Sequence, residues 1–483
     1  MTVNQFLAID LGAESGRAML GTLENGKLSL EELHRFPNTA VRLPTGLYWD
    51  TLRLFYEIRR SLEICGRRRG VRLQGIGIDT WGVDFALLGS DGALVDNPRH
   101  YRDARNAGML EKTFAVIPRE EIFAETGVQL MAINSLYQLY AMKLAASPAL
   151  ASATRLLFIP DLLNYWLTGV PRAEQTIAST SQFYNPRTRT WATTLFDRLG
   201  LPTSILPEIV APGTRIGNLL PEIAETSGFD APVPVYATAC HDTASAVAAV
   251  PVSGDKGWCY ISSGTWSLLG AEIDAPIVND RALELNFTNE MGADGKVRLL
   301  KNIAGLWLLQ ECRRAWALEG KEYSYADLAA MAEAAPPSRL RIDPDEFLSP
   351  GNMPEQIAGH CRERGERAPE DPGAFCRLIL ESLAESYTRV LHRLESLLGR
   401  PIDVVHIVGG GSRNRLLNQL TADFSGKTVV AGPTEATAAG NILVQALGAG
   451  VVSGLSEVRA ITRASFDLET FVPKAKPGAV ASR

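Results

Sequence analysis

The feature that most restricts the fold of this 483-residue chain is a run of strand patterns at its amino-terminal end. The continuous apolar stretch 6–10 predicts a buried strand, and 17–23 predicts a second one. Asn25-Gly26 predicts a two-residue hairpin turn, because both residues tolerate positive φ, and 28–36 predicts the returning strand. The chain therefore opens with three antiparallel strands, the first of them buried.

A helix and another buried strand follow the hairpin. A helical apolar stripe over 50–65, with Asp50 as a candidate N-cap, is formed by Leu52, Phe55, Ile58, Leu62 and Ile64. The stretch 75–79 predicts a further buried strand. Antiparallel strands that lead into a strand–helix alternation indicate a mixed sheet with helices on its faces.

A weaker copy of this plan begins near Lys256. Strands are predicted at 258–262 and 266–271, around the turn Ser262-Ser263-Gly264-Thr265. The length of 483 residues predicts two large domains or three small ones, and the repeated plan is typical of a two-domain α/β protein but does not decide the number by itself. We expect an N-terminal domain over 1–245, a C-terminal domain over 246–462, and a final segment with a loose tail over 463–483. A helical, proline-rich insertion is expected between 324 and 372.

Composition excludes several classes of protein. The net charge is −6, and no basic run is long enough to follow a phosphodiester backbone, so no nucleic-acid partner is expected. There is no uninterrupted apolar window of membrane-spanning length and no secretory leader before the first strand, which favours a cytoplasmic protein. The cysteines lack C-x-x-C spacing, so buried free thiols are expected rather than zinc ligands or disulfides: Cys65, Cys240, Cys259, Cys312, Cys361 and Cys376.

The first candidate site is the turn between the first two strands, Asp10-Leu11-Gly12-Ala13-Glu14-Ser15-Gly16-Arg17. Its glycines let the backbone approach an anion, and successive N–H groups in such a turn form an anion-binding nest. Asp10, at the end of a strand, can hold magnesium through water. Ser15 and Arg17 can contact phosphate oxygens. A plain hairpin with a solvated aspartate is the alternative.

The second candidate site is the triple glycine 409–411, between a predicted strand at 404–408 and a predicted helix. Glycines allow a flat adenine or ribose to lie against the backbone, and the helix N-terminus supplies free N–H groups. A dinucleotide-binding turn is the rival interpretation, but the G-x-G-x-x-G spacing is absent. A purely structural turn is the other alternative.

The third candidate site is His241-Asp242-Thr243, at a predicted strand-to-helix junction. An aspartate there can serve simply as an N-cap. It can also serve as a general base that accepts a proton as a sugar hydroxyl attacks phosphorus. Phosphoryl transfer needs one positioned carboxylate, magnesium and phosphate-binding N–H groups.

These segments, with Thr80 to Phe85 between them, match in order the motifs of the FGGY carbohydrate kinases, which the chain resembles over about 6–471. The resemblance implies a two-domain, actin-like ATPase (ribonuclease H-like) α/β fold with the active site in the interdomain cleft. Within the family, the segments 77–85, 241–247 and 300–310 are most similar to kinases that act on L-rhamnulose. ATP and Mg²⁺ are the implied cofactors, and the implied product is L-rhamnulose 1-phosphate.

The resemblance also implies roles for individual residues. Asp242 would be the proton acceptor, and Asp10 would hold the metal. Contacts to the sugar would come from Trp81, Gly82, His241, Thr243 and Asn302. Contacts to ATP would come from Ala13, Glu14, Ser15, Gly16, Arg17, Thr265, Gln310 and Gly410. Glu14 is unusual in a phosphate loop and should point away from phosphate or reach magnesium.

Other interpretations stay open. The chain could phosphorylate another substrate, such as L-fuculose, xylulose or glycerol, or be an actin-like nucleotide-binding protein without a small substrate. A catalytically dead sugar sensor is a third possibility, which the intact Asp10 and Asp242 argue against. Relatives can carry cysteines where this chain has Cys361 and Cys376, but a disulfide is not expected in the cytosol. Sequence does not distinguish a monomer from a homodimer.

Overall fold

The computed structural model describes residues 3–254, 257–349 and 351–474, and the chain forms two compact units. Unit 1 comprises 1–249, 272–299 and 436–465, and unit 2 comprises 250–271, 300–435 and 466–483. These units are defined by packing. The predicted domain borders, which divide the chain by sequence, stay a prediction, and most of the predicted tail (475–483) lies outside the described residues.

Unit 1 is built on a six-stranded mixed sheet in the order β13-β14-β6-β1-β2-β3. β1 pairs antiparallel with β2 and parallel with β6, and β14 is also parallel to β6. Asn25 and Gly26 have φ of 53° and 71°, which confirms the predicted hairpin turn. The strands are β1 (Asn4–Leu11), β2 (Ser15–Glu24), β3 (Lys27–Pro37), β6 (Leu73–Thr80), β13 (Thr214–Asn218) and β14 (Pro234–Ala237).

The helices α1 (Thr51–Gly66) and α6 (Ile159–Thr168) cover one face of this sheet. Their apolar side chains share a core with alternate residues of β1 and β6, including Leu7, Ile9 and Ile78. The predicted helix is confirmed, and Asp50 caps it by accepting a hydrogen bond from the N–H of Arg53 at 3.0 Å. Alternation along each strand places one set of side chains against these helices and the other set on the opposite face.

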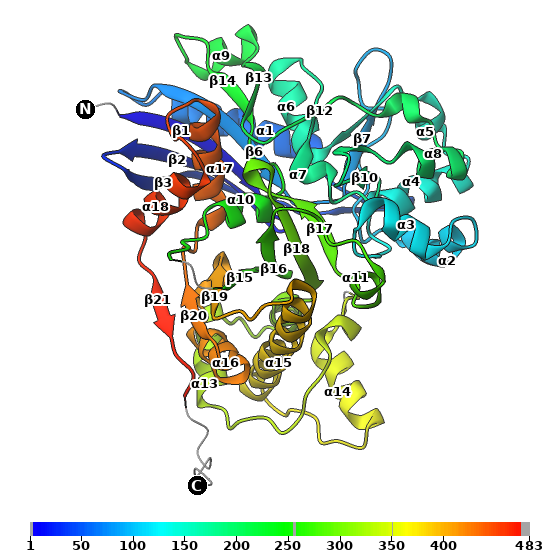
Figure 1. The fold of residues 1–483 in the computed structure, drawn as a ribbon, viewed down its shortest axis with the longest axis vertical. Helices are drawn as coiled ribbons and strands as arrows, with labels where there is room; N and C mark the ends of the chain where they lie inside the picture. The colour runs from blue at the N-terminus through cyan, green and yellow to red at the C-terminus, as the bar shows by residue number, and fades with distance from the viewer. Residues whose placement is uncertain (1–2, 255–256, 350, 475–483) are drawn as a thin grey trace. The chain divides into compact units, whose positions relative to one another are not determined.

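On the opposite face lie α10 (Asp242–Ala248), α17 (Ala436–Gly448) and α18 (Leu455–Ser465). Figure 1 shows α17, drawn in orange, beside the blue strands that begin the chain. The strands carry small residues here because the helix is close: a Cβ on Gly21 would lie 2.5 Å from Ile442. Helix α17 also contacts α10, where a Cβ on Gly440 would lie 1.7 Å from the carbonyl oxygen of Ser245.

Two buried amides of α17 connect it to the sheet. Asn441 donates through Nδ2 to the carboxylate of Asp79 at 2.5 Å, and Gln445 donates through Nε2 to the carbonyl of Leu7 at 3.1 Å. A buried polar group is tolerated where it is hydrogen-bonded. These contacts fix the position of α17 along the sheet more specifically than apolar packing alone would.

The rest of unit 1 packs around a second apolar core that includes Phe158, Phe183 and Phe196. Its elements are β4 (Val41–Leu43), β5 (Gly46–Tyr48), β7 (Phe85–Leu88), η1 (Ala104–Asn106), α2 (Met109–Phe114), α3 (Arg119–Thr126), α4 (Ser135–Leu144), α5 (Pro148–Ser152), β8 (Arg155–Phe158), β9 (Ala173–Glu174), α7 (Gln175–Ala178), β10 (Tyr184–Asn185), β11 (Thr190–Trp191), α8 (Thr193–Leu199), η2 (Thr203–Ile205), β12 (Ile209–Val210), α9 (Pro221–Ser227), α11 (Asp280–Glu284), β17 (Thr288–Met291) and η3 (Ala293–Gly295).

Unit 2 contains a mixed sheet in which β16, β15, β19, β20 and β21 are neighbours in that order. The predicted strand pair around Ser263-Gly264 is confirmed as the antiparallel pair of β15 and β16. The strands are β15 (Trp258–Ser263), β16 (Ser267–Ile273), β19 (Val404–Val408), β20 (Thr428–Ala431) and β21 (Glu469–Phe471), with β18 (Val297–Ile303) passing from unit 1 into unit 2. Its helical elements are α12 (Trp307–Leu318), α13 (Tyr325–Ala334), η4 (Pro344–Glu346), α14 (Met353–Glu363), α15 (Pro372–Leu398), η5 (Gly410–Arg413) and α16 (Arg415–Ser425).

All six cysteines are buried, and none forms a disulfide in the structure. Cys361 and Cys376 are thus separate thiols. Cys376 instead acts electrostatically on Cys312. Among the described residues, no helix combines the length and the apolar character needed to cross a bilayer.

Candidate functional site

The candidate site of unit 1 lies where three parallel strands end. Asp10 and Asp79 are partners in the register of β1 and β6, and β14 ends at Ala237, shortly before His241. The N–H of Thr80 donates to the carbonyl of Cys240 at 2.9 Å, which holds the end of β6 beside the start of α10. The carboxyl ends of parallel strands are the usual location of ligand sites in open α/β sheets.

The predicted phosphate turn is closed by its own backbone. The N–H of Gly12 donates to the carbonyl of Ser15 at 2.9 Å, and Asn38 donates through Nδ2 to the carbonyl of Gly12 at 2.8 Å. Ala13 and Ser15 are partly accessible, and Glu14 is exposed. Gly16 is buried against the ring of Phe36, and a Cβ at this position would lie 2.4 Å from that ring. The hydrogen bonds therefore fix the shape of the turn, and residues 13–15 remain accessible to solvent.

Asp10, the predicted metal ligand, is paired with Arg17. Its Oδ2 accepts from Nε and Nη2 of Arg17 at 3.1 and 2.8 Å. Asp79, opposite Asp10, is fully buried, and its Oδ1 has no hydrogen-bond partner. Burial, followed by the charge of Asp10, raises the pKa of Asp79 well above its usual range.

This carboxylate pair bears on the implied magnesium ion. The described residues contain no group of three or more His, Cys, Asp or Glu side chains that could hold a metal by itself. Mg²⁺ is usually bound by one or two carboxylates, with water and substrate phosphates completing its shell. Asp10 and the orphaned oxygen of Asp79 fit that requirement, and a divalent cation would offset the repulsion between the two carboxylates.

Asp242 is the first residue of α10, and the N-cap position belongs to His241. The aspartate is therefore not the N-cap of this helix. Its Oδ1 accepts from the N–H and the Oγ1 of Thr243, at 2.5 and 3.0 Å, and its side chain is 30% exposed. Burial raises the pKa of Asp242, the neighbouring His241 opposes that rise, and the charge of Asp10 adds to it. The result is an accessible carboxylate with enhanced basicity.

His241 lies between Asp242 and a buried ion pair. Its Nε2 is 3.4 Å from Oδ1 of Asp242, and its Nδ1 is 3.1 Å from Nη2 of Arg298 and 3.3 Å from Oε2 of Glu290. Arg298 is fully buried and donates to Glu290 at 3.0 Å. Burial opposes the ionisation of Glu290, but the contacts with His241 and Arg298 outweigh it and lower the pKa of that carboxyl.

Trp81 and Gly82 follow β6 directly. The ring of Trp81 is largely buried and packs against Trp49 at 4.0 Å between centroids. Its Nε1 donates to Oδ2 of Asp84 at 3.0 Å, and Nε1 of Trp49 donates to the same oxygen at 2.6 Å. A Cβ on Gly82 would lie 3.1 Å from Thr180. Thr80, directly before this segment, pairs with His241 in a parallel β-bridge, so Trp81 and Gly82 follow the strand end next to His241.

The remaining predicted site residues lie in unit 2. Thr265 is in the turn between β15 and β16, where its carbonyl accepts from the N–H of Trp307 at 3.1 Å, and Asn302 is in β18. Gln310 is in α12, and its buried Oε1 has no hydrogen-bond partner. Each unit thus carries its own group of predicted residues.

The triple glycine of unit 2 has one open position and one crowded position. A Cβ on Gly411 would lie 2.0 Å from Oγ of Ser263, whereas a Cβ on Gly410 would meet no atom within 4 Å. Gly409 has φ of 83°, which a residue with a side chain adopts only with strain. The predicted nucleotide contact, Gly410, is therefore the glycine beside free space.

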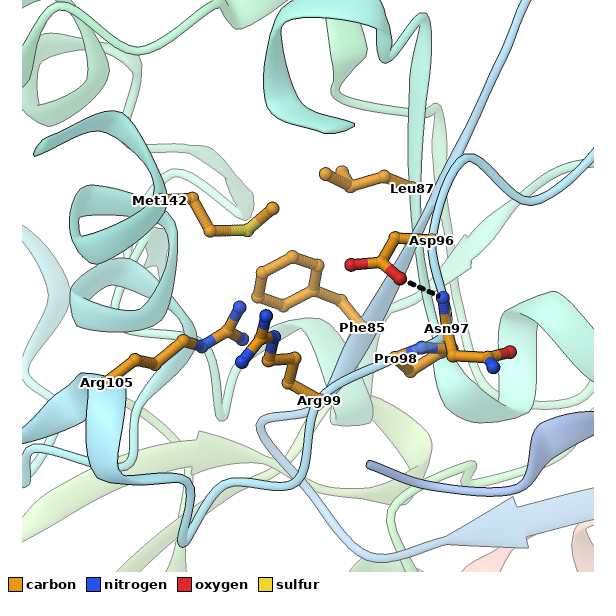
Figure 2. Close-up of a pocket in the computed structure, with 8 residues that line it drawn as sticks. All are labelled: Phe85, Leu87, Asp96, Asn97, Pro98, Arg99, Arg105 and Met142. Carbon is orange, nitrogen blue, oxygen red and sulfur yellow. Dashed lines mark hydrogen bonds between the residues drawn. The ribbon is translucent and has the colours of Figure 1, made fainter. Parts of the chain in front are cut away.

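A separate pocket lies in unit 1, and none of the predicted site residues lines it. It is a small solvent-open cleft (Figure 2), lined by Phe85, Leu87, Asp96, Asn97, Pro98, Arg99, Arg105 and Met142. Burial and the charge of Arg99 lower the pKa of Arg105 to about 10. Arg105 donates to Gln138, which donates to Asp84, so the cleft is connected to the group that holds Trp81.

Sequence reasoning missed four acidic or basic residues of the site: Asp79, Asp84, Glu290 and Arg298. A signal was present for the last two. Glu290 and Arg298 are charged residues inside short strand patterns, Thr288–Met291 and Val297–Ile303. Charged side chains in a buried strand usually have a specific partner.

Two solved structures with an overall fold like that of this chain are sugar kinases. Gluconate kinase from Lactobacillus acidophilus matches with a TM-score of 0.80 and 16% identity, covering 98% of this chain and 94% of that one. Plasmodium falciparum glycerol kinase with ADP matches with a TM-score of 0.77 and 16% identity, over the same shares of the two chains. These similarities confirm the predicted two-domain α/β fold.

Sequence comparison identifies the family. The N-terminal domain of the FGGY family of carbohydrate kinases matches residues 5–249, and its C-terminal domain matches 259–449. A rhamnulokinase from Bacteroides thetaiotaomicron is 45% identical over 471 residues, which are 97% of this chain and 96% of that protein. A rhamnulokinase from Oceanobacillus iheyensis is 42% identical over 96% of this chain and 97% of that protein. The chain belongs to the FGGY family of carbohydrate kinases.

Proposed function

We propose that this protein transfers the γ-phosphoryl group of ATP to the C1 hydroxyl of L-rhamnulose, forming L-rhamnulose 1-phosphate and ADP. The similarity to rhamnulokinases over nearly the whole chain supports the choice of sugar. The structural observation that carries the proposal is Asp242, an accessible carboxylate with a raised pKa at the carboxyl ends of three parallel strands.

In the proposed reaction, Asp242 accepts the proton of the C1 hydroxyl while that oxygen attacks the γ-phosphorus in line. Thr243 holds Oδ1 of Asp242 by two hydrogen bonds, so the carboxylate presents a fixed geometry. Trp81, Gly82, His241, Thr243 and Asn302 are proposed to contact the sugar. A positioned carboxylate of suitable basicity is the main chemical requirement for activating an alcohol.

Contacts to the nucleotide are proposed in each unit separately. Residues 13–17 present the phosphate turn of unit 1, and Thr265, Gln310 and Gly410 supply contacts from unit 2. The orphaned Oε1 of Gln310 and the open side of Gly410 support this assignment, because both can take a ligand without losing an existing contact. Asp10, with Asp79, would hold Mg²⁺, which supplies charge neutralisation at the phosphoryl oxygens.

ADP release tests the proposed substrate. Purified protein is mixed with Mg-ATP and, separately, with L-rhamnulose, L-fuculose, D-xylulose, glycerol or no sugar. We expect kcat/KM for L-rhamnulose to be at least about tenfold the next value, which corresponds to roughly 1.4 kcal/mol of transition-state discrimination. A higher value for another sugar would change the substrate and keep the kinase. ADP release that no sugar stimulates would favour the actin-like alternative.

Replacement of the proposed base tests the mechanism. Asp242→Asn should lower kcat by about 10²–10⁴-fold, because a general base typically contributes that factor, while the affinity for Mg-ATP changes little. Asp197→Asn, an exposed aspartate of α8, is the matched control and should keep wild-type activity. Steady-state kinetics and ATP titration of both variants measure the effect. A fully active Asp242→Asn enzyme would overturn the assignment of the base.

A further inference from the structure

A buried ion pair supports the imidazole that faces the proposed base. Arg298, in β18, has no accessible surface, and Glu290, in β17, is 4% exposed. Arg298 donates through Nε to the carbonyl of Met291 at 3.0 Å and through Nη2 to Oε2 of Glu290 at 3.0 Å. Burying a charged pair costs desolvation energy, so such a pair persists where it has a specific task or very good geometry.

The second contact of Nη2 decides where His241 carries its proton. Nη2 lies 3.1 Å from Nδ1 of His241 with hydrogen-bond geometry. A guanidinium group has donors and no acceptor, so Nδ1 must accept. A neutral imidazole has one accepting and one donating nitrogen, so the proton is on Nε2. Nε2 lies 3.4 Å from Oδ1 of Asp242.

We propose that Arg298 is a positioning residue that keeps His241 in the Nε2–H tautomer, with Glu290 compensating its charge, so that a ring N–H rather than a lone pair faces Oδ1 of the proposed base. This inference rests on the proposed role of Asp242. Neither Arg298 nor Glu290 touches the reacting atoms. Arg298 acts through the imidazole, in the way that an outer hydrogen-bond partner fixes the tautomer of a catalytic or metal-binding histidine, and Glu290 acts through Arg298.

The two carboxylate oxygens of Asp242 have different surroundings and therefore different proposed roles. Oδ1 receives the N–H and Oγ1 of Thr243, and Nε2 of His241 lies 3.4 Å from the same atom. Oδ2 accepts no hydrogen bond from the described residues. A donor at Oδ1 favours the ionised carboxylate and prevents its rotation, which leaves Oδ2 to receive the proton of the sugar hydroxyl.

Glu290 has two effects in this arrangement. It compensates the charge of Arg298, so the guanidinium can remain buried beside a neutral ring. It also competes for His241, because its Oε2 is 3.3 Å from Nδ1. Without Arg298, Glu290 would attract a proton to Nδ1, and Nε2 would then present a lone pair to Asp242.

Nuclear magnetic resonance of the full-length protein with ¹⁵N-labelled histidine tests the tautomer directly. The chain has six histidines, and the His241→Asn variant identifies the ring signals of His241. Two-bond nitrogen–proton correlations distinguish Nε2–H from Nδ1–H. We expect Nε2–H in the wild type and in Glu290→Gln, where Arg298 is retained. A wild-type ring with Nδ1–H would overturn the proposal.

Kinetics of Arg298 variants test the consequence. Arg298→Met should convert His241 to the Nδ1–H form and lower kcat by roughly 10–100-fold, the usual effect of removing an outer partner that orients a histidine, while KM for Mg-ATP is unchanged. Arg298→Lys keeps a donor without an acceptor, so it should retain Nε2–H and most of kcat. Arg298→Met with an Nε2–H ring and wild-type kcat would overturn the proposal, as would Arg298→Lys with an Nδ1–H ring.

The variants distinguish a failure of the proposed base from a failure of the proposed tautomer. If Arg298→Met does not fold, the wild type, Arg298→Lys and Glu290→Gln still decide the tautomer. If Asp242→Asn is active although His241 is in the Nε2–H form, the proposed base is wrong and the tautomer assignment stands. If Asp242→Asn is inactive and wild-type His241 is in the Nδ1–H form, the proposed base stands and the role of Arg298 is wrong.

Discussion

At the scale of single residues, Asp84 shows how one buried carboxylate organises the segment beside the proposed base. Its Oδ2 accepts from the indole N–H groups of Trp49 and Trp81, and from the backbone N–H of Tyr101 at 3.2 Å. Gln138 donates to its other oxygen at 3.0 Å. Burial nevertheless raises the pKa of Asp84 to about 6, because these neutral donors offset the loss of water only in part.

This raised pKa makes stability depend on pH. The folded state holds the proton of Asp84 up to about pH 6, and the unfolded state releases it near the ordinary value of 3.8. The group therefore stabilises the fold most below about pH 4, and that contribution is lost as pH rises to about 6. The loss is on the order of 3 kcal/mol.

The side chain of the Asp84→Asn variant cannot ionise, so this variant should lack the dependence of stability on pH that Asp84 causes. Relative to the variant, the wild type should lose stability between pH 4 and 6 and show no further relative change between pH 6 and 8. Urea unfolding at several pH values, followed by tryptophan fluorescence, measures the difference. The exposed-site control Asp197→Asn should follow the wild type at every pH, and a constant offset between wild type and Asp84→Asn would contradict the prediction.

The candidate site was predictable from sequence where its chemistry is local. Asp10 and the His241–Thr243 segment lie at strand ends, in short motifs whose residues indicate a chemical role from the sequence alone. Glu290 and Arg298 lie about 50 residues from His241 in sequence, and only the path of β17 and β18 brings them to it. No local pattern contains that information.

At the scale of elements, the contact between α10 and α17 depends on the absence of one side chain. Gly440 lies in the interior of α17, where glycine normally lowers helix stability by roughly 0.5–1 kcal/mol relative to alanine. At position 440 we expect glycine to be more stable than alanine, because a Cβ would lie 1.7 Å from the backbone oxygen of Ser245.

Gly440→Ala should therefore destabilise unit 1 by about 1–3 kcal/mol or more, the usual range for overpacking of a close contact. Gly359→Ala in α14 is the matched control: its Cβ would approach only the end of Arg362, at 3.8 Å. That variant should gain roughly 0.5–1 kcal/mol from helix propensity. Thermal unfolding of the two variants compares them, and equal shifts in Tm would refute the argument.

The strands β1 to β3, α1 and β6 follow from local patterns of apolar residues, turn residues and caps, which is why their prediction was successful. The role of α17 does not follow from such patterns. Its sequence, rich in Ala, Ile, Leu and Val, predicts only a buried helix. Strand β1, which it covers, begins more than 400 residues earlier, and the glycines that admit it are spread over β2 and β6.

At the scale of the whole molecule, the chain passes between the two packing units five times. Unit 1 takes α17 and α18 from the end of the chain, and these helices cover the face of its sheet opposite α1 and α6. A chain cut after residue 249 would keep the six strands of that sheet but leave this face exposed. Exposed apolar area of that kind promotes association and loss of fixed packing.

A fragment of residues 1–249 should therefore have helical and sheet content without native tertiary structure. Far-UV circular dichroism, near-UV circular dichroism and size-exclusion chromatography compare it with residues 1–474, which keep every described element. We expect the longer chain to be cooperative and native, and the fragment to lack near-UV signal or to aggregate. A monomeric fragment with native near-UV signal would show that α17 is dispensable.

The late position of α17 also has a consequence during synthesis on the ribosome. Strand β6 is complete at Thr80, but α17 ends only at Gly448, some 370 codons later. At about 5–20 residues per second, the central strands wait on the order of 20–70 s for the helix that covers them. During that interval one face of the nascent sheet is available to chaperones and to neighbouring chains. The rate of translation should therefore affect the yield of active enzyme more than it would for a protein whose domains each close before the next begins.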